Sequence, residues 1–263
     1  MRAYVIAMNP YFQAEQLKYR NSSMQKVTVL MPFCSVFFAA MLTHNFFTVD
    51  SYNWWYMILF PGMAAIVCGM ISAKDGREKN RTIFTMPCDP GQIWDAKVFY
   101  GACISGIATI VMTFFTVFGG WLMETALHIK FTLNPSVPMQ VAASLVMWVS
   151  FLWQIPFCLF LSQKIGTFWT LLIHVASYFV ISEDVSLTPY YMLVPQALSA
   201  RMMCPLLGVL PNGLPAVPGE LTYSPQMTDP QSLLIGIPAS VLWFVLLWFL
   251  TRKWFTVRAE RGK

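Results

Sequence analysis

The stretch Val98 to Met123, VFYGACISGIATIVMTFFTVFGGWLM, contains no Asp, Glu, Lys or Arg. A helix rises about 1.5 Å per residue and the hydrocarbon core of a bilayer is about 30 Å thick, so roughly 20 apolar residues cross it. Strands of a membrane β-barrel would instead alternate in polarity over about ten residues. This stretch therefore predicts a membrane-spanning α-helix.

Five further stretches share this uncharged, apolar composition, and they cover residues 27–47, 52–73, 138–163, 165–182 and 232–251. The chain of 263 residues is 57% hydrophobic and only 11% charged, with a mean hydropathy of +0.56. Soluble domains carry about 25% charged residues. We therefore expect an all-α integral membrane protein, with six transmembrane helices in one domain over residues 1–263.

Positive residues are distributed unevenly between the two sides of the predicted bundle. Of the 17 Lys and Arg, all but Lys130 and Arg201 fall on the side of the two termini. The formal charge of +5 is thus +9 on that side and −4 on the other. Positive residues in short loops stay in the cytoplasm, so we expect both termini there. The basic excess indicates contact with anionic lipid and gives no reason to expect nucleic acid.

Residues 9–26, before the first span, combine apolar positions with the charged residues Glu15, Lys18 and Arg20. This pattern predicts an amphipathic helix that lies along the inner membrane face. A solvated arm is the alternative reading.

The longest cytoplasmic loop, 74–97, reads KDGREKNRTIFTMPCDPGQIWDAK. Asp89 before Pro90 is expected to cap a helix that runs into the third span. Residues 82–86 are expected to form a short helix parallel to the membrane. A charged loop that presents apolar residues in this way suits docking to a cytoplasmic partner.

The extracellular segment 183–231 holds eight of the 17 prolines. Within it, residues 190–210 predict a re-entrant or interfacial helix, with Gln196 and Ser199 facing water. Near the start of the second span, aromatic residues at 52–56 are expected to form an interfacial belt. Of six cysteines only Cys204 is placed outside, which excludes an external disulfide within the chain.

Signals of catalysis or cofactor binding are weak. No GxxxxGK[ST] motif is present to cradle nucleotide phosphates, and the three histidines lack metal-site spacing. His174 lies deep in a span, which makes it a candidate functional residue, although a structural role is the more common one. A serine-protease pair of Ser105 and His174 matches no pattern of intramembrane proteases. We expect no catalytic, cofactor or metal site in this chain.

The layout resembles the ABC-2 type permeases, and within them the lantibiotic-immunity permease subunits. The residues that carry this resemblance are the lead-in EQLKYRNS at Glu15 to Ser22, the Met-Pro pair and closing Asp-Ala-Lys of the loop 78–97, and the structured outer segment before the last span.

The resemblance implies a permease in the bacterial plasma membrane that works with two copies of a separate ATPase and a second, often nonidentical permease. ATP and Mg²⁺ would be bound by the ATPase, and the complex would remove lantibiotic-type peptides from the membrane. The family's coupling loop maps to Glu78, Arg81, Phe84, Pro87 and Lys97. The acidic outer face suits a cationic peptide, and its candidate substrate-facing residues are Glu183, Asp184, Arg201, Glu220 and Asp229.

Two other functions stay open at the level of sequence. One is an ABC-2 permease that exports a drug, lipid or glycan. The other is a membrane-embedded enzyme or sensor that works without an ATPase.

Overall fold

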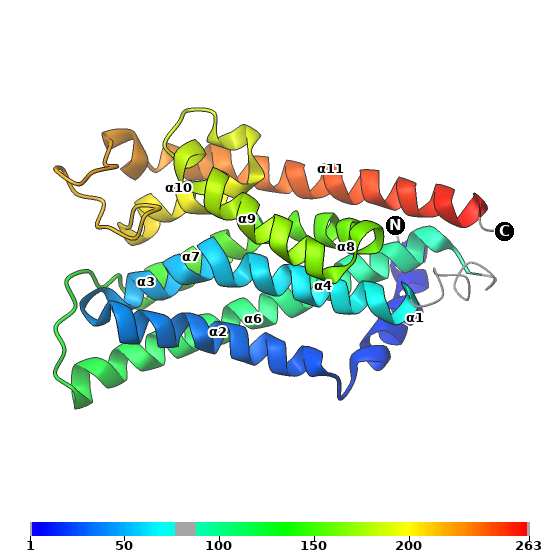
Figure 1. The fold of residues 1–263 in the computed structure, drawn as a ribbon, viewed down its shortest axis with the longest axis horizontal. Helices are drawn as coiled ribbons and strands as arrows, with labels where there is room; N and C mark the ends of the chain where they lie inside the picture. The colour runs from blue at the N-terminus through cyan, green and yellow to red at the C-terminus, as the bar shows by residue number, and fades with distance from the viewer. Residues whose placement is uncertain (1, 77–87, 262–263) are drawn as a thin grey trace.

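The structure is a computed structural model that describes residues 2–76 and 88–261 (Figure 1). Every regular element in these two ranges is helical, and one isolated β-bridge joins Val209 and Pro215. The elements are α1 (Arg2–Tyr19), α2 (Ser23–Leu42), η1 (His44–Phe46), α3 (Phe47–Trp54), η2 (Trp55–Leu59), α4 (Phe60–Gly76), α6 (Pro90–Ala126), α7 (Val137–Phe151), α8 (Gln154–Ile165), α9 (Thr167–Ser186), η3 (Tyr191–Leu193), α10 (Pro195–Leu207), η4 (Pro225–Thr228) and α11 (Gln231–Arg261).

Six helical segments are long and apolar enough to cross a membrane, which confirms the all-α class and the six predicted spans. They are Ser23–Leu42, His44–Asp75, Pro90–Ala126, Val137–Ile165, Thr167–Ser186 and Gln231–Glu260. Large apolar side chains on their outer faces, such as Ile110, Val180 and Leu242, are 69–71% exposed. An exterior of this kind is expected of helices that face lipid.

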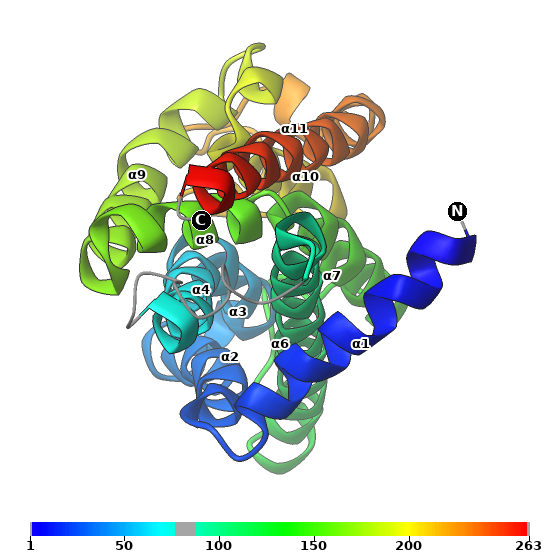
Figure 2. The same ribbon diagram turned by 90° about the vertical axis from the view of Figure 1, so that its right-hand side faces the viewer.

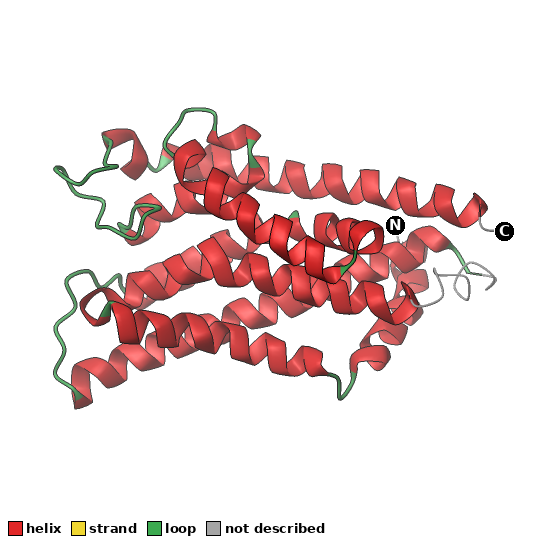
Figure 3. Ribbon diagram, viewed as in Figure 1, coloured by secondary structure: helices red, strands yellow, loops and turns green. Residues whose placement is uncertain are grey.

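The spans lie side by side, and the two chain ends are found at the same end of the bundle (Figure 1). We call this the terminal end; α4 finishes there and α6 begins there. The longest described loops gather at the opposite end, which we call the far end (Figure 3). Helix α1 runs across the terminal end and packs against α6 (Figure 2).

The amphipathic helix differs from its predicted bounds of 9–26. Helix α1 ends at Tyr19, Asn21 adopts a left-handed backbone with φ of 63°, and α2 starts at Ser23. Ser22 caps α2 by accepting a hydrogen bond from the Met24 N–H at 3.3 Å. A serine N-cap of this type starts a new helix, so the chain turns sharply before the first span.

The junction between the first two spans lies earlier in the sequence than predicted. Thr43 leaves the helical region with φ of −141°, so the first span ends at Leu42, and the second continues from η1 through α3, the π-helical turn η2 and α4. The expected aromatic belt is wrong, because Tyr52, Trp55 and Tyr56 are completely buried. Tyr52 belongs to α3, whereas Trp55 and Tyr56 open the π-helical turn η2.

The fourth span is broken between α7 and α8. The break at Leu152 and Trp153 comes three residues before Pro156. Proline lacks the N–H that would bond to the carbonyl of Leu152 and its ring crowds that carbonyl, so the helix opens there.

Helix α10 is the predicted short helix of the outer segment, but it is enclosed by α7, α9 and α11. The expectation that Ser199 faces water is wrong, since Ser199 is completely buried, and Gln196 is only half-buried. The helix ends at Gly208, whose φ of 68° is a left-handed cap. Residues from several spans close over α10, which the pattern of a single segment does not reveal.

Candidate functional site

The strongest concentration of buried charge lies at the terminal end, beside the two helix ends that flank residues 77–87. Of the predicted coupling residues, Glu78, Arg81, Phe84 and Pro87 lie outside the described residues. Lys97 is described, and it is 0% exposed.

Local structure brings α6 into this region as the sequence predicted. Asp89 is the N-cap of α6, and its carboxylate accepts a hydrogen bond from the Gly91 N–H at 2.8 Å. Pro90 occupies the first turn, where its missing N–H costs nothing. From this fixed start, Lys97 lies two turns into the helix and faces α1 and the last turn of α4.

Four charged side chains from three helices form one ion-pair network. Lys97 Nζ lies 3.1 Å from Glu15 Oε1 and also contacts the carboxylate of Asp75. Lys18 Nζ lies 2.8 Å from Glu15 and 3.0 Å from Asp75. We call Glu15, Lys18, Asp75 and Lys97 the α1 charge network; two cations balance two carboxylates in it.

Most of this network is buried, so the ion pairs matter for the stability of the protein. Glu15 is 2% exposed and Asp75 is 12% exposed, while Lys18 is 31% exposed. Burial alone would lower the pKa of Lys18, but the carboxylates of Glu15 and Asp75 raise it above its ordinary value of 10.5. Charges removed from water must be paired, so each side chain here depends on the others.

Tyr19 and Lys74 extend the attachment of α1 to α4. Tyr19 donates a hydrogen bond to the Ile71 carbonyl at 3.2 Å and stacks on Tyr100 with ring centroids 5.3 Å apart. Lys74 Nζ lies over the Tyr19 ring at 5.3 Å and donates to the Lys18 carbonyl. Helix α1 is thus bound at its C-terminal end to both helices that flank residues 77–87.

A second charged contact joins α6 to α11. Both carboxylate oxygens of Asp95 lie 3.0 Å from Arg252 Nε, and Asp95 also accepts a bond from Trp248 Nε1 at 2.7 Å. Next to it, Trp94 Nε1 donates to Thr251 Oγ1 at 3.1 Å. The first two turns of α6 are therefore fixed to α1 on one side and to α11 on the other.

The sequence showed that the residues of the α1 charge network are charged, but it did not predict that they form ion pairs with one another. Glu15 and Lys18 were predicted only as charged residues of an amphipathic helix along the inner membrane face, whereas Glu15 is buried against α6. Arg20 does remain exposed, in the turn after α1. One feature of the sequence could have indicated the network. Lys97 lies on an otherwise apolar turn of a helix, and a lysine that is buried there needs a carboxylate partner.

At the far end, the predicted substrate-facing residues have different environments. Asp184 and Asp229 are exposed, and Glu183 and Glu220 are half-buried. None of these four acidic residues forms an ion pair in the part of the chain that the structure describes. Asp229 caps the start of α11 by accepting from the Gln231 N–H at 2.9 Å.

Arg201 differs from these acidic residues, because it is only 6% exposed. Its guanidinium donates to the Ser186 carbonyl at 3.1 Å and to the Gln226 carbonyl at 2.6 Å, and it lies 5.2 Å from the ring centroid of Tyr191. Arg201 therefore holds α9, η3 and η4 around α10.

A pocket of about 510 Å³ lies at the far end between α6 and the start of α7. Glu124 accepts a bond from Asn134 Nδ2 at 2.8 Å at its polar edge, and Phe118 and Trp121 form aromatic walls. We call this the far-end pocket. Sequence reasoning missed it, because Glu124 and Asn134 are ten residues apart and approach only through the loop after α6.

His174 is part of a buried polar chain within the spans. Its Nε2 lies 2.9 Å from Gln154 Oε1, and Gln154 Nε2 donates to the Tyr178 hydroxyl at 2.7 Å. Ser105 instead donates to the Ala102 carbonyl at 2.8 Å and accepts from Trp148. The structure thus gives no contact between Ser105 and His174, and the described ranges hold no group of three His, Cys, Asp or Glu spaced for a metal.

Comparison with known proteins adds no relative. No family model matches the sequence, and neither a curated protein nor a solved structure matches it.

Proposed function

We propose that this chain is the permease subunit of an ABC transporter that removes lantibiotic-type antimicrobial peptides from the bacterial plasma membrane. In this proposal the terminal end lies in the cytoplasm, which agrees with the 15 of 17 positive residues on that side. ATP and Mg²⁺ are bound by two copies of a separate ATPase, and a second, nonidentical permease completes the complex.

The α1 charge network is the observation that carries the proposal. Glu15 and Lys18 on α1 bind Asp75 at the end of α4 and Lys97 near the start of α6, so both flanks of the segment 77–87 are tied to one helix. Packed and ion-paired elements move together. A force that an ATPase exerts on this segment would therefore shift α4, α6 and α1 as a unit.

The far end supplies the features that a cationic, amphiphilic peptide needs. Glu183, Asp184, Glu220 and Asp229 carry negative charge there, and the net charge of this side is −4. An acidic surface raises the local concentration of cationic ligands. The far-end pocket adds Glu124 beside aromatic rings, which attract ammonium groups through their faces.

Exchanging the charges of Glu78 and Arg81 tests the proposal, with the chain expressed together with its ATPase in a peptide-sensitive bacterium. We expect the double variant Glu78→Lys/Arg81→Glu to lose peptide resistance and ATPase copurification at unchanged membrane levels. The matched control Lys253→Glu/Glu260→Lys exchanges two exposed charges on α11 and should keep both.

Unimpaired resistance in the Glu78/Arg81 variant would overturn the coupling role. If the ATPase copurifies with the unaltered chain but no peptide resistance is conferred, the chain exports another substrate, such as a drug, lipid or glycan. If no ATPase copurifies, a membrane-embedded enzyme or sensor is favoured instead.

A further inference from the structure

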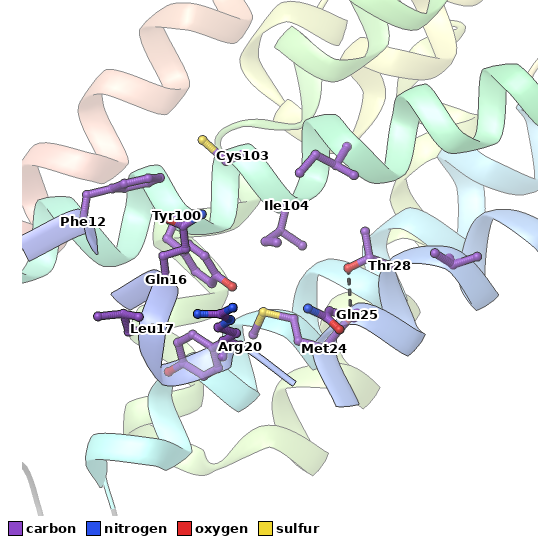
Figure 4. Close-up of a pocket in the computed structure, with 13 residues that line it drawn as sticks. Phe12, Gln16, Leu17, Arg20, Met24, Gln25, Thr28, Tyr100, Cys103 and Ile104 are labelled. Atoms are coloured by element: carbon purple, nitrogen blue, oxygen red, sulfur yellow. Dashed lines mark hydrogen bonds between the residues drawn. The ribbon is translucent and has the colours of Figure 1, made fainter. Parts of the chain in front are cut away.

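A pocket of about 620 Å³ lies where α1 turns into α2, with α6 as its third wall. Phe12, Gln16 and Arg20 line it from α1 and the following turn, and Ile104 lines it from α6 (Figure 4). We call it the α1 pocket. It shares no lining residue with the far-end pocket, and the proposed peptide transport makes no use of it.

The polar side of the α1 pocket includes three side chains for which no partner is found in the described part of the chain: Gln16, Arg20 and Gln25. Among the described lining residues Arg20 alone is charged, and it has no ion pair or side-chain hydrogen bond in the described part of the chain. The two neighbouring lysines of α1 and α6, Lys18 and Lys97, are already bound to carboxylates. The guanidinium of Arg20 therefore remains available for an anion from outside the chain.

The carboxamides of Gln16 and Gln25 lie in the same region as this guanidinium (Figure 4). Both residues are exposed, and no side-chain partner is found for either within the described ranges. Two amides and a guanidinium together offer several N–H donors, a set that suits the oxygens of a phosphate.

The remaining wall of the α1 pocket is apolar and follows the spans. Met24 and Val29 belong to α2, and Ile104 and Ile107 belong to α6. Val29 and Ile107 are 48% and 50% exposed, so this wall is open on its outer side. A ligand that fills the pocket must accordingly be polar at one end and hydrocarbon at the other.

We propose that the α1 pocket binds one anionic phospholipid, with its phosphate on Arg20 and an acyl chain along α2 and α6. Basic pockets between membrane helices on the cytoplasmic side are recognised sites for acidic headgroups. The charge favours an anionic over a zwitterionic lipid, because none of the described lining residues has a carboxylate to receive a choline or ethanolamine group.

A ligand in the α1 pocket affects α1, because this helix both lines the pocket and carries two residues of the α1 charge network. Tyr19 lines the α1 pocket and also bonds to the Ile71 carbonyl of α4. A lipid seated in the pocket contacts both α1 and α6 and opposes their separation, so occupancy stabilises the α1 charge network. The proposal does not depend on peptide transport.

The test is thermal unfolding of the delipidated full-length chain in neutral detergent, titrated with dihexanoyl phosphatidylglycerol. Dihexanoyl phosphatidylcholine tests headgroup charge, and glycerol phosphate tests the headgroup without acyl chains. We expect saturable stabilisation by phosphatidylglycerol alone. In Arg20→Gln its apparent affinity should fall roughly fivefold, the effect of about one basic side chain on acidic lipid.

Two further variants separate the site from general charge. Gln16→Glu places a carboxylate one helical turn before Arg20, where it competes for the guanidinium, and should weaken binding as Arg20→Gln does. Lys26→Gln removes an exposed charge nearby that does not line the pocket and should bind as the unaltered chain does.

Three results would overturn the proposal: equal stabilisation by phosphatidylcholine, equal stabilisation by glycerol phosphate, or equal weakening in Lys26→Gln and Arg20→Gln.

Discussion

Replacing Lys97 with Met removes the central cation of the α1 charge network at nearly constant side-chain volume. Lys97 is 0% exposed, lies 3.1 Å from Glu15 and contacts Asp75. In the variant the two carboxylates, 2% and 12% exposed, share Lys18 as their remaining cation. The balanced cluster then carries a net negative charge out of contact with most water.

The expected cost follows from this geometry. Removing one partner of a buried ion pair destabilises a protein by about 3–5 kcal/mol. Because Lys18 still contacts both carboxylates, we expect the lower end, about 3 kcal/mol. At about 2–4 °C per kcal/mol for a chain of this size, the melting temperature should fall by about 6–12 °C.

The assay is thermal unfolding of the purified chain in nanodiscs, followed by circular dichroism. The double variant Lys97→Met/Glu15→Gln restores charge balance, so it should be more stable than Lys97→Met alone, with a coupling energy of about 1–3 kcal/mol. Lys253→Met is the control, since Lys253 is exposed and should change stability by less than about 0.5 kcal/mol.

A surface substitution is expected to shift the melting temperature by about 2 °C or less. The reasoning is refuted if the melting temperatures of Lys97→Met and Lys253→Met differ by no more than this. It is also refuted if the double variant is no more stable than Lys97→Met.

Three other predictions concern separate parts of the chain. The pKa of Lys18 is raised above 10.5, so the melting temperature difference between the unaltered chain and Lys18→Gln should stay constant up to about pH 10 and shrink above it; shrinkage below pH 9 would contradict this. Gly69→Ala would place its Cβ 2.7 Å from Thr167 Cβ and should cost about 1–3 kcal/mol, whereas Gly62→Ala has neighbours at 3.8 Å and should cost less; equal melting temperatures would refute the close approach. Arg201→Gln removes charged bonds of 2.6 and 3.1 Å to backbone carbonyls, so limited proteolysis between residues 209 and 230 should speed up, and an unchanged cleavage rate would disprove that role.

Sequence reasoning works best where the membrane itself imposes the pattern. Uncharged runs of about 20 residues follow directly from bilayer thickness, so all six spans were predictable. The cap at Asp89 was predictable as well, because it depends only on neighbouring residues.

Features that depend on packing between distant segments were not predictable in the same way. Ser199 of α10 and Tyr52 of α3 carry polar groups that suit a surface, yet both are completely buried. The buried partners of Lys97 come from positions 82 and 22 residues earlier. No local sequence pattern predicts such long-range contacts, since they form only when the helices associate.

Helix α6 is a single unbroken rod of 37 residues, which at about 1.5 Å per residue is roughly 55 Å long, nearly twice the hydrocarbon thickness. Asp95 and Lys97 fix one end to the neighbouring helices, and Trp121 and Glu124 line the far-end pocket at the other. For a stiff lever of this length, a tilt of about 10° about one end displaces the other by roughly 10 Å. Displacement at one face of the membrane therefore reaches the opposite face without a hinge, a ligand or a change in secondary structure between them.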